Sequence, residues 1–132
     1  MDLSFRAFLK TLKENDELLE ISRPVDLRNV AALVPQAEKA VLFSNVRGHS
    51  MPVVSGLLNS RRRLALAMGV EYSGIEAKLR AAMDRPIPPK VGKGAAGKTI
   101  LTGNKVDLYR LPVPIFGVMD GGPMITGGVV IA

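Results

Sequence analysis

The chain begins with apolar side chains at the spacing of an α-helix. Phe5, Phe8 and Leu12 recur at intervals of three or four residues, with charged residues between them. Ser4 precedes this stripe, and its hydroxyl can accept a hydrogen bond from the first helical turn. The pattern therefore predicts a helix over residues 5–14.

Three later apolar segments are too short for helices and are bounded by turn residues. Residues 18–22, 41–46 and 51–54 are rich in branched and other apolar side chains, which predicts strands. Between the first two, Asp26 can cap a second helix, although Pro35 is expected to disturb the last turn of that helix.

Capping residues predict two more helices. Ser60 or its predecessor can cap a helix over residues 61–68, and Gly69 can end it in the left-handed conformation. A capping-box pattern at residues 73–76 precedes an apolar stripe that predicts a helix over residues 74–83. Together with the strands, these helices indicate an α/β (α+β) fold with a small mixed sheet and flanking helices.

A proline-rich segment divides the chain. Three prolines between Asp84 and Lys90 exclude regular structure there, so we assign residues 1–89 to an N-terminal α/β domain. Residues 90–110 are interpreted as a basic Gly/Ala loop and connecting segment. Residues 111–132 contain two Gly pairs and end in an apolar β-branched run, which predicts the first strand of another domain.

Charge is concentrated in the middle of the chain. The formal net charge of the 132 residues is +6, and twelve Lys or Arg lie between Arg47 and Arg110 against four acids. Such a balance is compatible with nucleic acid or an anionic ligand, but few aromatic residues are interleaved with these charges, as a base-stacking surface would require. Residues 61–63 place three arginines in the first turn of a helix, where the helix dipole disfavours cations. They have either an anionic partner or, as we expect, a solvated position.

Composition limits the chemistry and the compartment. The chain has no cysteine, which excludes disulfides and thiolate metal sites. No apolar run approaches the roughly 20 residues that span a bilayer, and the N-terminus does not resemble an export signal. We therefore expect a cytoplasmic protein with no membrane partner.

Two candidate chemical features are weak. His49, the one histidine, lies in a predicted turn beside Gly48, and we interpret it as a turn residue and not as a base or ligand. Residues 92–99 match the phosphate-binding pattern GxxxxGK[ST] letter for letter. That pattern needs a preceding strand and a following helix. Neither is predicted here, so residues 92–99 are interpreted as a flexible basic loop.

The C-terminal third carries a family resemblance. Residues 101–114, LTGNKVDLYRLPVP, and residues 120–132, DGGPMITGGVVIA, resemble the N-terminal region of the UbiD family of reversible decarboxylases. Residues 5–21 and 41–70 agree with it. Members of that family are much longer, so the resemblance identifies only an N-terminal portion.

The resemblance implies a function and a set of cofactors. Family members remove CO₂ reversibly and without oxidation from aromatic or α,β-unsaturated carboxylic acids, using prenylated FMN, Mn²⁺ and K⁺. They place an N-terminal α/β domain before a split β-barrel-like flavin domain, and a homo-oligomer is expected. Thr126 corresponds to a cofactor-binding position, whereas no residue here matches the family's catalytic or metal-binding positions. The fragment alone is therefore expected to be inactive.

Some features depart from the family pattern and leave other functions open. Met124 stands where an aromatic residue is common, Phe116-Gly117 where a His-containing stretch is frequent, and Gly128 where Ala is usual. These differences bear on the substrate. The alternatives are a non-catalytic interaction module or small subunit derived from the family and, in a different class, a basic nucleic-acid-binding domain. Residues 125–132 are expected to be poorly ordered, or to pair with the edge of another copy.

Overall fold

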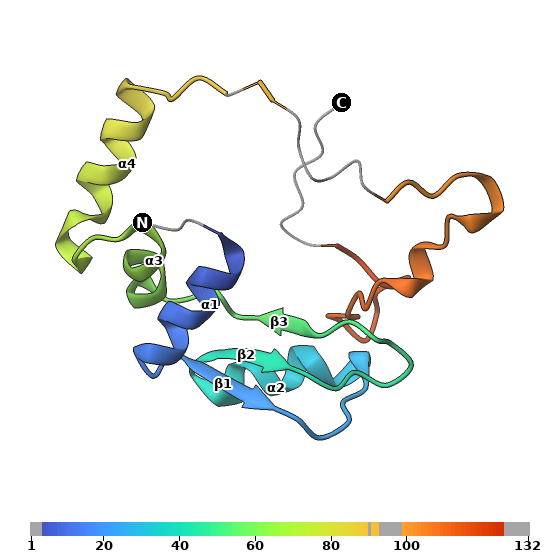
Figure 1. Cartoon of the computed structure of the whole chain (residues 1–132). Coiled ribbons are helices and arrows are strands. Elements are labelled where there is room, and N and C mark those ends of the chain that lie inside the picture. The colour runs from blue at the N-terminus through green and yellow to red at the C-terminus, as the bar shows by residue number, and fades with distance from the viewer. Residues whose placement is uncertain (1–3, 90, 93–98, 126–132) are drawn as a thin grey trace.

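A computed structural model of the chain describes residues 4–89, 91–92 and 99–125 (Figure 1). These ranges contain four α-helices and one three-stranded sheet, so the fold is mixed α/β as predicted. The elements follow one another as α1 Phe5–Glu14, β1 Leu18–Ile21, α2 Val30–Ala37, β2 Ala40–Phe43, β3 Val53–Ser55, α3 Arg61–Met68 and α4 Ile75–Asp84. Short 3-10 turns lie at Leu27–Asn29, Tyr72–Gly74, Gly103–Lys105 and Leu108–Arg110.

The sheet combines a parallel and an antiparallel pair in the order β1-β2-β3. Strand β1 runs parallel to β2, and α2 provides the connection between them. Strand β3 returns antiparallel to β2, with Val53 opposite Phe43. Strand β2 is therefore central, and β3 lies at one edge of the sheet.

The core lies between the sheet and α2. Phe43, Val41 and Val30 are fully buried, and Val34 of α2 packs in the same cluster. A second buried contact forms where α1 meets α3, around Leu12 and Ala65. Branched residues on β2 and α2 thus supply most of the apolar burial that stabilises the domain.

Local signals placed the helix ends correctly. Ser4 Oγ accepts a hydrogen bond from Ala7 N at 3.2 Å, and Ser60 Oγ accepts one from Arg63 N at 3.1 Å. Gly69 ends α3 with a left-handed φ of 64°. The predicted bounds of α1 and α3 are confirmed. The two helices lie next to each other at the end of the sheet where β1 and β2 begin (Figure 1).

Other boundaries differ from the prediction. The expected capping box at residues 73–76 is wrong, because the 3-10 turn Tyr72–Gly74 leads into α4 and Gly74 has no side-chain cap. Pro35 lies inside α2 and the helix continues to Ala37. The second and third strands are shorter than their apolar runs, since residues 44–52 form the turn between them.

The described residues beyond α4 contain short 3-10 turns but no α-helix and no strand. Helix α4 projects away from the sheet, and residues 85–89 continue from it without regular structure (Figure 1). Among residues 111–125 no strand forms, and the expected strand over 124–132 extends beyond the described residues. No described helix has the length and apolar character that a membrane crossing requires.

Candidate functional site

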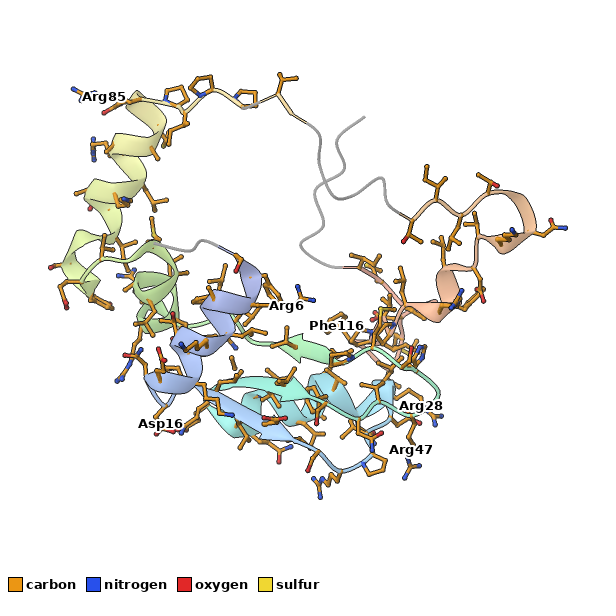
Figure 2. The ribbon with its side chains drawn as sticks, viewed as in Figure 1. Arg6, Asp16, Arg28, Arg47, Arg85 and Phe116 are labelled. Atoms are coloured by element: carbon orange, nitrogen blue, oxygen red, sulfur yellow. The ribbon has the colours of Figure 1, made fainter. Side chains whose placement is uncertain are left out.

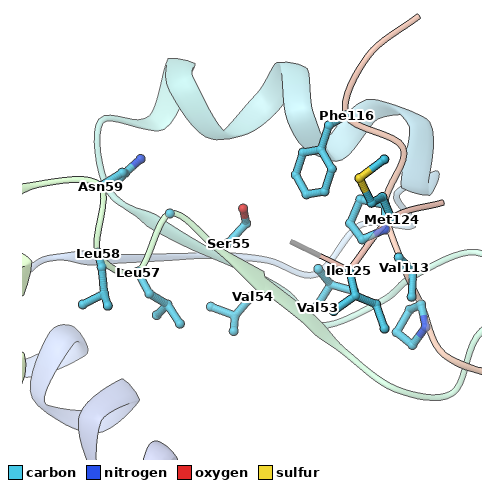
Figure 3. Close-up of a pocket in the computed structure, with 13 residues that line it drawn as sticks. Val53, Val54, Ser55, Leu57, Leu58, Asn59, Val113, Phe116, Met124 and Ile125 are labelled. Atoms are coloured by element: carbon cyan, nitrogen blue, oxygen red, sulfur yellow. The ribbon is translucent and has the colours of Figure 1, made fainter. Parts of the chain in front are cut away.

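An apolar groove lies between the edge strand β3 and the C-terminal segment (Figure 3). Its volume is about 790 Å³. One wall consists of residues 53–59, and the other consists of residues 112–114 together with Phe116, Met124 and Ile125. The groove therefore joins two parts of the chain that are distant in the sequence.

The β3 wall depends on a glycine at the end of the strand. Gly56 has a φ of 76°, which L residues with a side chain rarely adopt. A Cβ added to it would lie 3.0 Å from Val34 Cγ1 of α2. Glycine suits this turn because it tolerates both the left-handed φ and the close approach to α2, and the chain continues from it into Leu57 and Leu58, which also line the groove.

The opposite wall is positioned by short-range hydrogen bonds. Asp107 Oδ1 accepts from Tyr109 N at 2.9 Å and thereby caps the 3-10 turn before Pro112. Gly117 N donates to Asp120 Oδ2 at 2.7 Å, which closes the turn between Phe116 and Gly121. Both contacts lie within the segment and shape its turns.

One polar contact connects the two walls at their far end. His49 Nδ1 lies 3.4 Å from the backbone oxygen of Arg110. His49 lies in the turn before β3. Its backbone N–H donates to the backbone oxygen of Val46 at 3.1 Å, and the neighbouring Gly48 has a left-handed φ. The interpretation of His49 as a turn residue is confirmed, and it also borders a second hollow of about 470 Å³ beneath residues 108–125.

The lining of the groove is chemically simple. Its polar side chains are those of Ser55 and Asn59, and no charged residue lines it. The described residues contain no group of three His, Cys, Asp or Glu side chains that could hold a metal ion. No cationic side chain for a flavin phosphate and no carboxylate for Mn²⁺ lines the groove, so its side chains supply neither of these partners. The groove is a surface for apolar contact.

The remaining predicted site residues fall at the margin of the described chain. Thr126 lies outside the described residues, directly after Ile125 in the groove wall. Of the phosphate-like pattern, only Gly92 and Thr99 are described, and residues 100–102 after it form no helix. This agrees with the interpretation of that pattern as a loop.

The arginine run has an internal anionic partner. Arg63 is 3% exposed, and its guanidinium donates to Glu17 Oε2 at 2.8 Å and to the backbone oxygen of Glu38 at 3.1 Å. It also donates to Asn59 Oδ1. The expectation of a solvated position is therefore wrong for Arg63, because its side chain is buried. An ion pair and several hydrogen bonds compensate for the loss of water around its charge.

The other two arginines of the run are exposed but not free. Arg62 Nε lies 2.8 Å from the second carboxylate oxygen of Glu17. The Arg61 guanidinium lies 5.8 Å from the centre of the Tyr72 ring. The position of cations at the wrong end of a helix was the signal for such partners, but the sequence did not identify Glu17.

Two surface ion pairs shift carboxylate pKa values. Arg28 donates two side-chain hydrogen bonds and one backbone hydrogen bond to Asp26, which holds the pKa of Asp26 well below its usual range. Lys39, 2.6 Å from Asp16, lowers the pKa of that carboxyl through a hydrogen bond and charge attraction.

Arg28 and Phe116 lie at the same end of the molecule, opposite α4 and Arg85 (Figure 2).

Comparison with a family sequence model gives a match over residues 9–83. That model describes the 3-octaprenyl-4-hydroxybenzoate carboxy-lyase N-terminal domain. The match extends over more than half of the chain and includes all of the sheet.

Solved structures extend this likeness to the C-terminal segment. The chain is similar to an evolved dimeric form of the UbiD-class enzyme HmfF from Pelotomaculum thermopropionicum, solved in complex with prFMN, with 34% identity and a TM-score of 0.83. The match covers 92% of this chain and 30% of that chain. An HmfF structure in complex with FMN gives 35% identity and a TM-score of 0.80, with coverage of 89% and 28%.

A more distant structure has the same fold. The closed form of vanillic acid decarboxylase from Sedimentibacter hydroxybenzoicus matches with a TM-score of 0.80 and 24% identity, over 93% of this chain and 29% of that chain. This chain therefore spans less than a third of the length of these solved structures.

Proposed function

The chain belongs to the UbiD family, and from this premise we propose that it forms the N-terminal part of a reversible, prenylated-FMN-dependent decarboxylase. The observation that carries the proposal is the match to HmfF, at 34% identity over 92% of this chain. HmfF was solved with prFMN. The cofactor, Mn²⁺ and K⁺ would be held largely by residues beyond those described here, with Thr126 as this chain's contribution.

The proposed reaction is non-oxidative loss of CO₂ from an aromatic or α,β-unsaturated carboxylic acid. The bond between the carboxyl carbon and its neighbour breaks, its electron pair stays with the neighbouring carbon, and a proton replaces CO₂ there. Prenylated FMN, when bound, supplies the electron sink for this step. The described residues of this chain support the adjoining flavin domain, which we propose begins as a split β-barrel near residue 111.

A chimeric enzyme tests the proposal. The matched part of HmfF is replaced by this chain, and the protein is produced with a supply of prenylated FMN. We expect stoichiometric flavin absorbance and CO₂ release from the parent enzyme's own substrate. HmfF lacking its matched part is the control. A chimera that binds flavin but releases no more CO₂ than this control would contradict the proposal.

The isolated chain gives a second test. After incubation with prenylated FMN and Mn²⁺ and removal of free ligand, we expect no stoichiometric flavin fluorescence to remain with the 132 residues. The reason is that the groove offers no charged group to a phosphate. Stoichiometric retention would show that this chain alone holds the cofactor. It would contradict the proposal that residues outside this chain provide most of the cofactor site.

The exposed apolar groove also supports the alternative of a non-catalytic module or small subunit. Such a groove suits a contact with a separate protein as well as a contact with another domain. As such a subunit, the chain would restore activity to the shortened HmfF when added as a separate protein. The nucleic-acid alternative has less support, since two arginines of its basic run are paired with Glu17.

A further inference from the structure

The outer edge of β3 is an open position in the sheet. In the part of the chain that the structure describes, β2 is the one neighbour of β3. The backbone groups on the other edge are therefore available to another extended segment. This edge forms one wall of the apolar groove (Figure 3), so the same place offers both backbone hydrogen bonds and apolar contact.

Large apolar side chains of the groove are exposed although they lie in a hollow. Leu58 is 57% exposed, Phe116 42% and Ile125 67%. Solvation of a contiguous apolar surface of this kind is unfavourable, and in soluble proteins it marks an interaction site. The groove is thus prepared for an apolar occupant that the described residues do not supply.

We propose that the groove receives the cofactor-carrying part of a UbiD-class enzyme, which lays an extended apolar segment along β3. This inference rests on the proposed function. The matched HmfF chain carries prFMN, and this chain corresponds to only 30% of it. More than two thirds of that enzyme therefore lies outside the matched region, and it is there that we place the occupant. Addition of a strand to an exposed edge is a common mode of recognition.

Charge argues against a second copy as the occupant. The chain carries a net charge of +6. Arg110 comes two residues before the groove wall that begins at Pro112, and it has no ion pair among the described residues. Two copies of a chain with this net positive charge repel each other, which disfavours their association. An occupant with acidic groups beside its apolar segment matches this rim.

Hydrogen exchange of the HmfF chimera tests the inference. We expect the amides of Val53–Ser55 and of residues 112–125 to exchange at least about tenfold more slowly in the chimera than in the isolated chain, because backbone pairing and burial slow exchange. Equal rates in the two proteins would overturn the inference. Flavin absorbance is read in the same samples. Slow exchange without flavin contradicts only the proposed function, and flavin without slow exchange contradicts only the docking surface.

Substitutions at the surface sharpen this test. Phe116→Asp in the chimera should return the β3 amides to the rates of the isolated chain, whereas Met83→Asp should not, since Met83 is 81% exposed on α4 and does not line the groove. In the isolated chain, Phe116→Asp should leave the thermal unfolding midpoint unchanged. Either an unfolded isolated variant or unchanged protection in the Phe116→Asp chimera would contradict the proposed surface.

Discussion

Two regions of the molecule differ in how their apolar residues are used. Among the described residues, all of the buried apolar side chains lie between Leu12 and Ala65, in the part that contains the sheet and the first three helices. No described residue after Val70 is buried, although the later region contains large apolar side chains such as Phe116, Met119 and Ile125. Among the described residues, the first region has its own core, whereas the large apolar side chains of the second are left exposed.

The exposed region nevertheless belongs to the shared fold. The match to HmfF covers 92% of the chain, which is too much to leave out residues 99–125. The segment thus follows a path similar to that in the relatives, while its apolar side chains remain in solvent here. The difference teaches that a shared backbone path and an apolar core of its own are separate properties, because residues 99–125 have the first without the second.

The largest expected effect compares one phenylalanine from each region. Phe43 is fully buried in the core, so Phe43→Ala should lower the free energy of unfolding by about 3–5 kcal/mol. Phe116 is 42% exposed, and Phe116→Ala should cost less than about 1 kcal/mol. Urea unfolding followed by circular dichroism measures both. Similar losses would mean that the two regions share one core.

The next effect concerns the buried ion pair of the first region. Arg63→Ala leaves Glu17, whose side chain is 13% exposed, without its buried partner, and should cost about 3 kcal/mol. Arg62 binds the same carboxylate from a position that is 68% exposed, so Arg62→Ala should cost less than about 1 kcal/mol. Equal effects in urea unfolding would show that Arg63 contributes no more than a surface arginine.

A matched pair of glycines tests the turn that forms the groove wall. Gly56→Ala places a Cβ 3.0 Å from Val34 in a left-handed conformation, and should cost about 1–3 kcal/mol. Gly48 has a similar φ but open space around it, so Gly48→Ala should cost about 1 kcal/mol. The thermal unfolding midpoints should fall in that order. If the order is reversed, contact with α2 does not define the turn.

The smallest effect is a pH dependence within the first region. The folded pKa of Asp26 is depressed by Arg28, so the folded state binds the proton less readily than the unfolded state. The resulting stabilisation is present above the unfolded pKa of about 4 and is lost as the pH falls toward the folded pKa. Asp26→Asn should destabilise the protein at pH 6 and have a smaller effect near pH 2. Unfolding curves at the two pH values measure this, and a constant difference would contradict it.

Local features of the first region could be predicted from the sequence. The bounds of α1 and α3 followed from apolar spacing and from the caps Ser4, Ser60 and Gly69. Each of these signals depends on residues within one turn of each other. The burial of Arg63 could not be predicted, because Glu17 lies 46 residues away in the sequence.

Less of the candidate site than of the fold could be predicted from the sequence. The apolar character of residues 111–125 predicted a need for cover, but the groove arises only when this segment lies beside β3, some sixty residues earlier. The family resemblance identified the UbiD family through DGGPMIT and LPVP. It did not reveal the surface, and the assignment of cofactor binding to Thr126 stays a prediction.

Native-state hydrogen exchange of the isolated chain tests the central difference most directly. We predict slow exchange for the amides of β1, β2 and α1, which unfold only with the core, and exchange at least about a hundredfold faster for residues 99–125. Mass spectrometry of peptic fragments resolves the two regions. Comparable protection of residues 99–125 and the core strands would contradict the account, because the second region would then be stable without a partner.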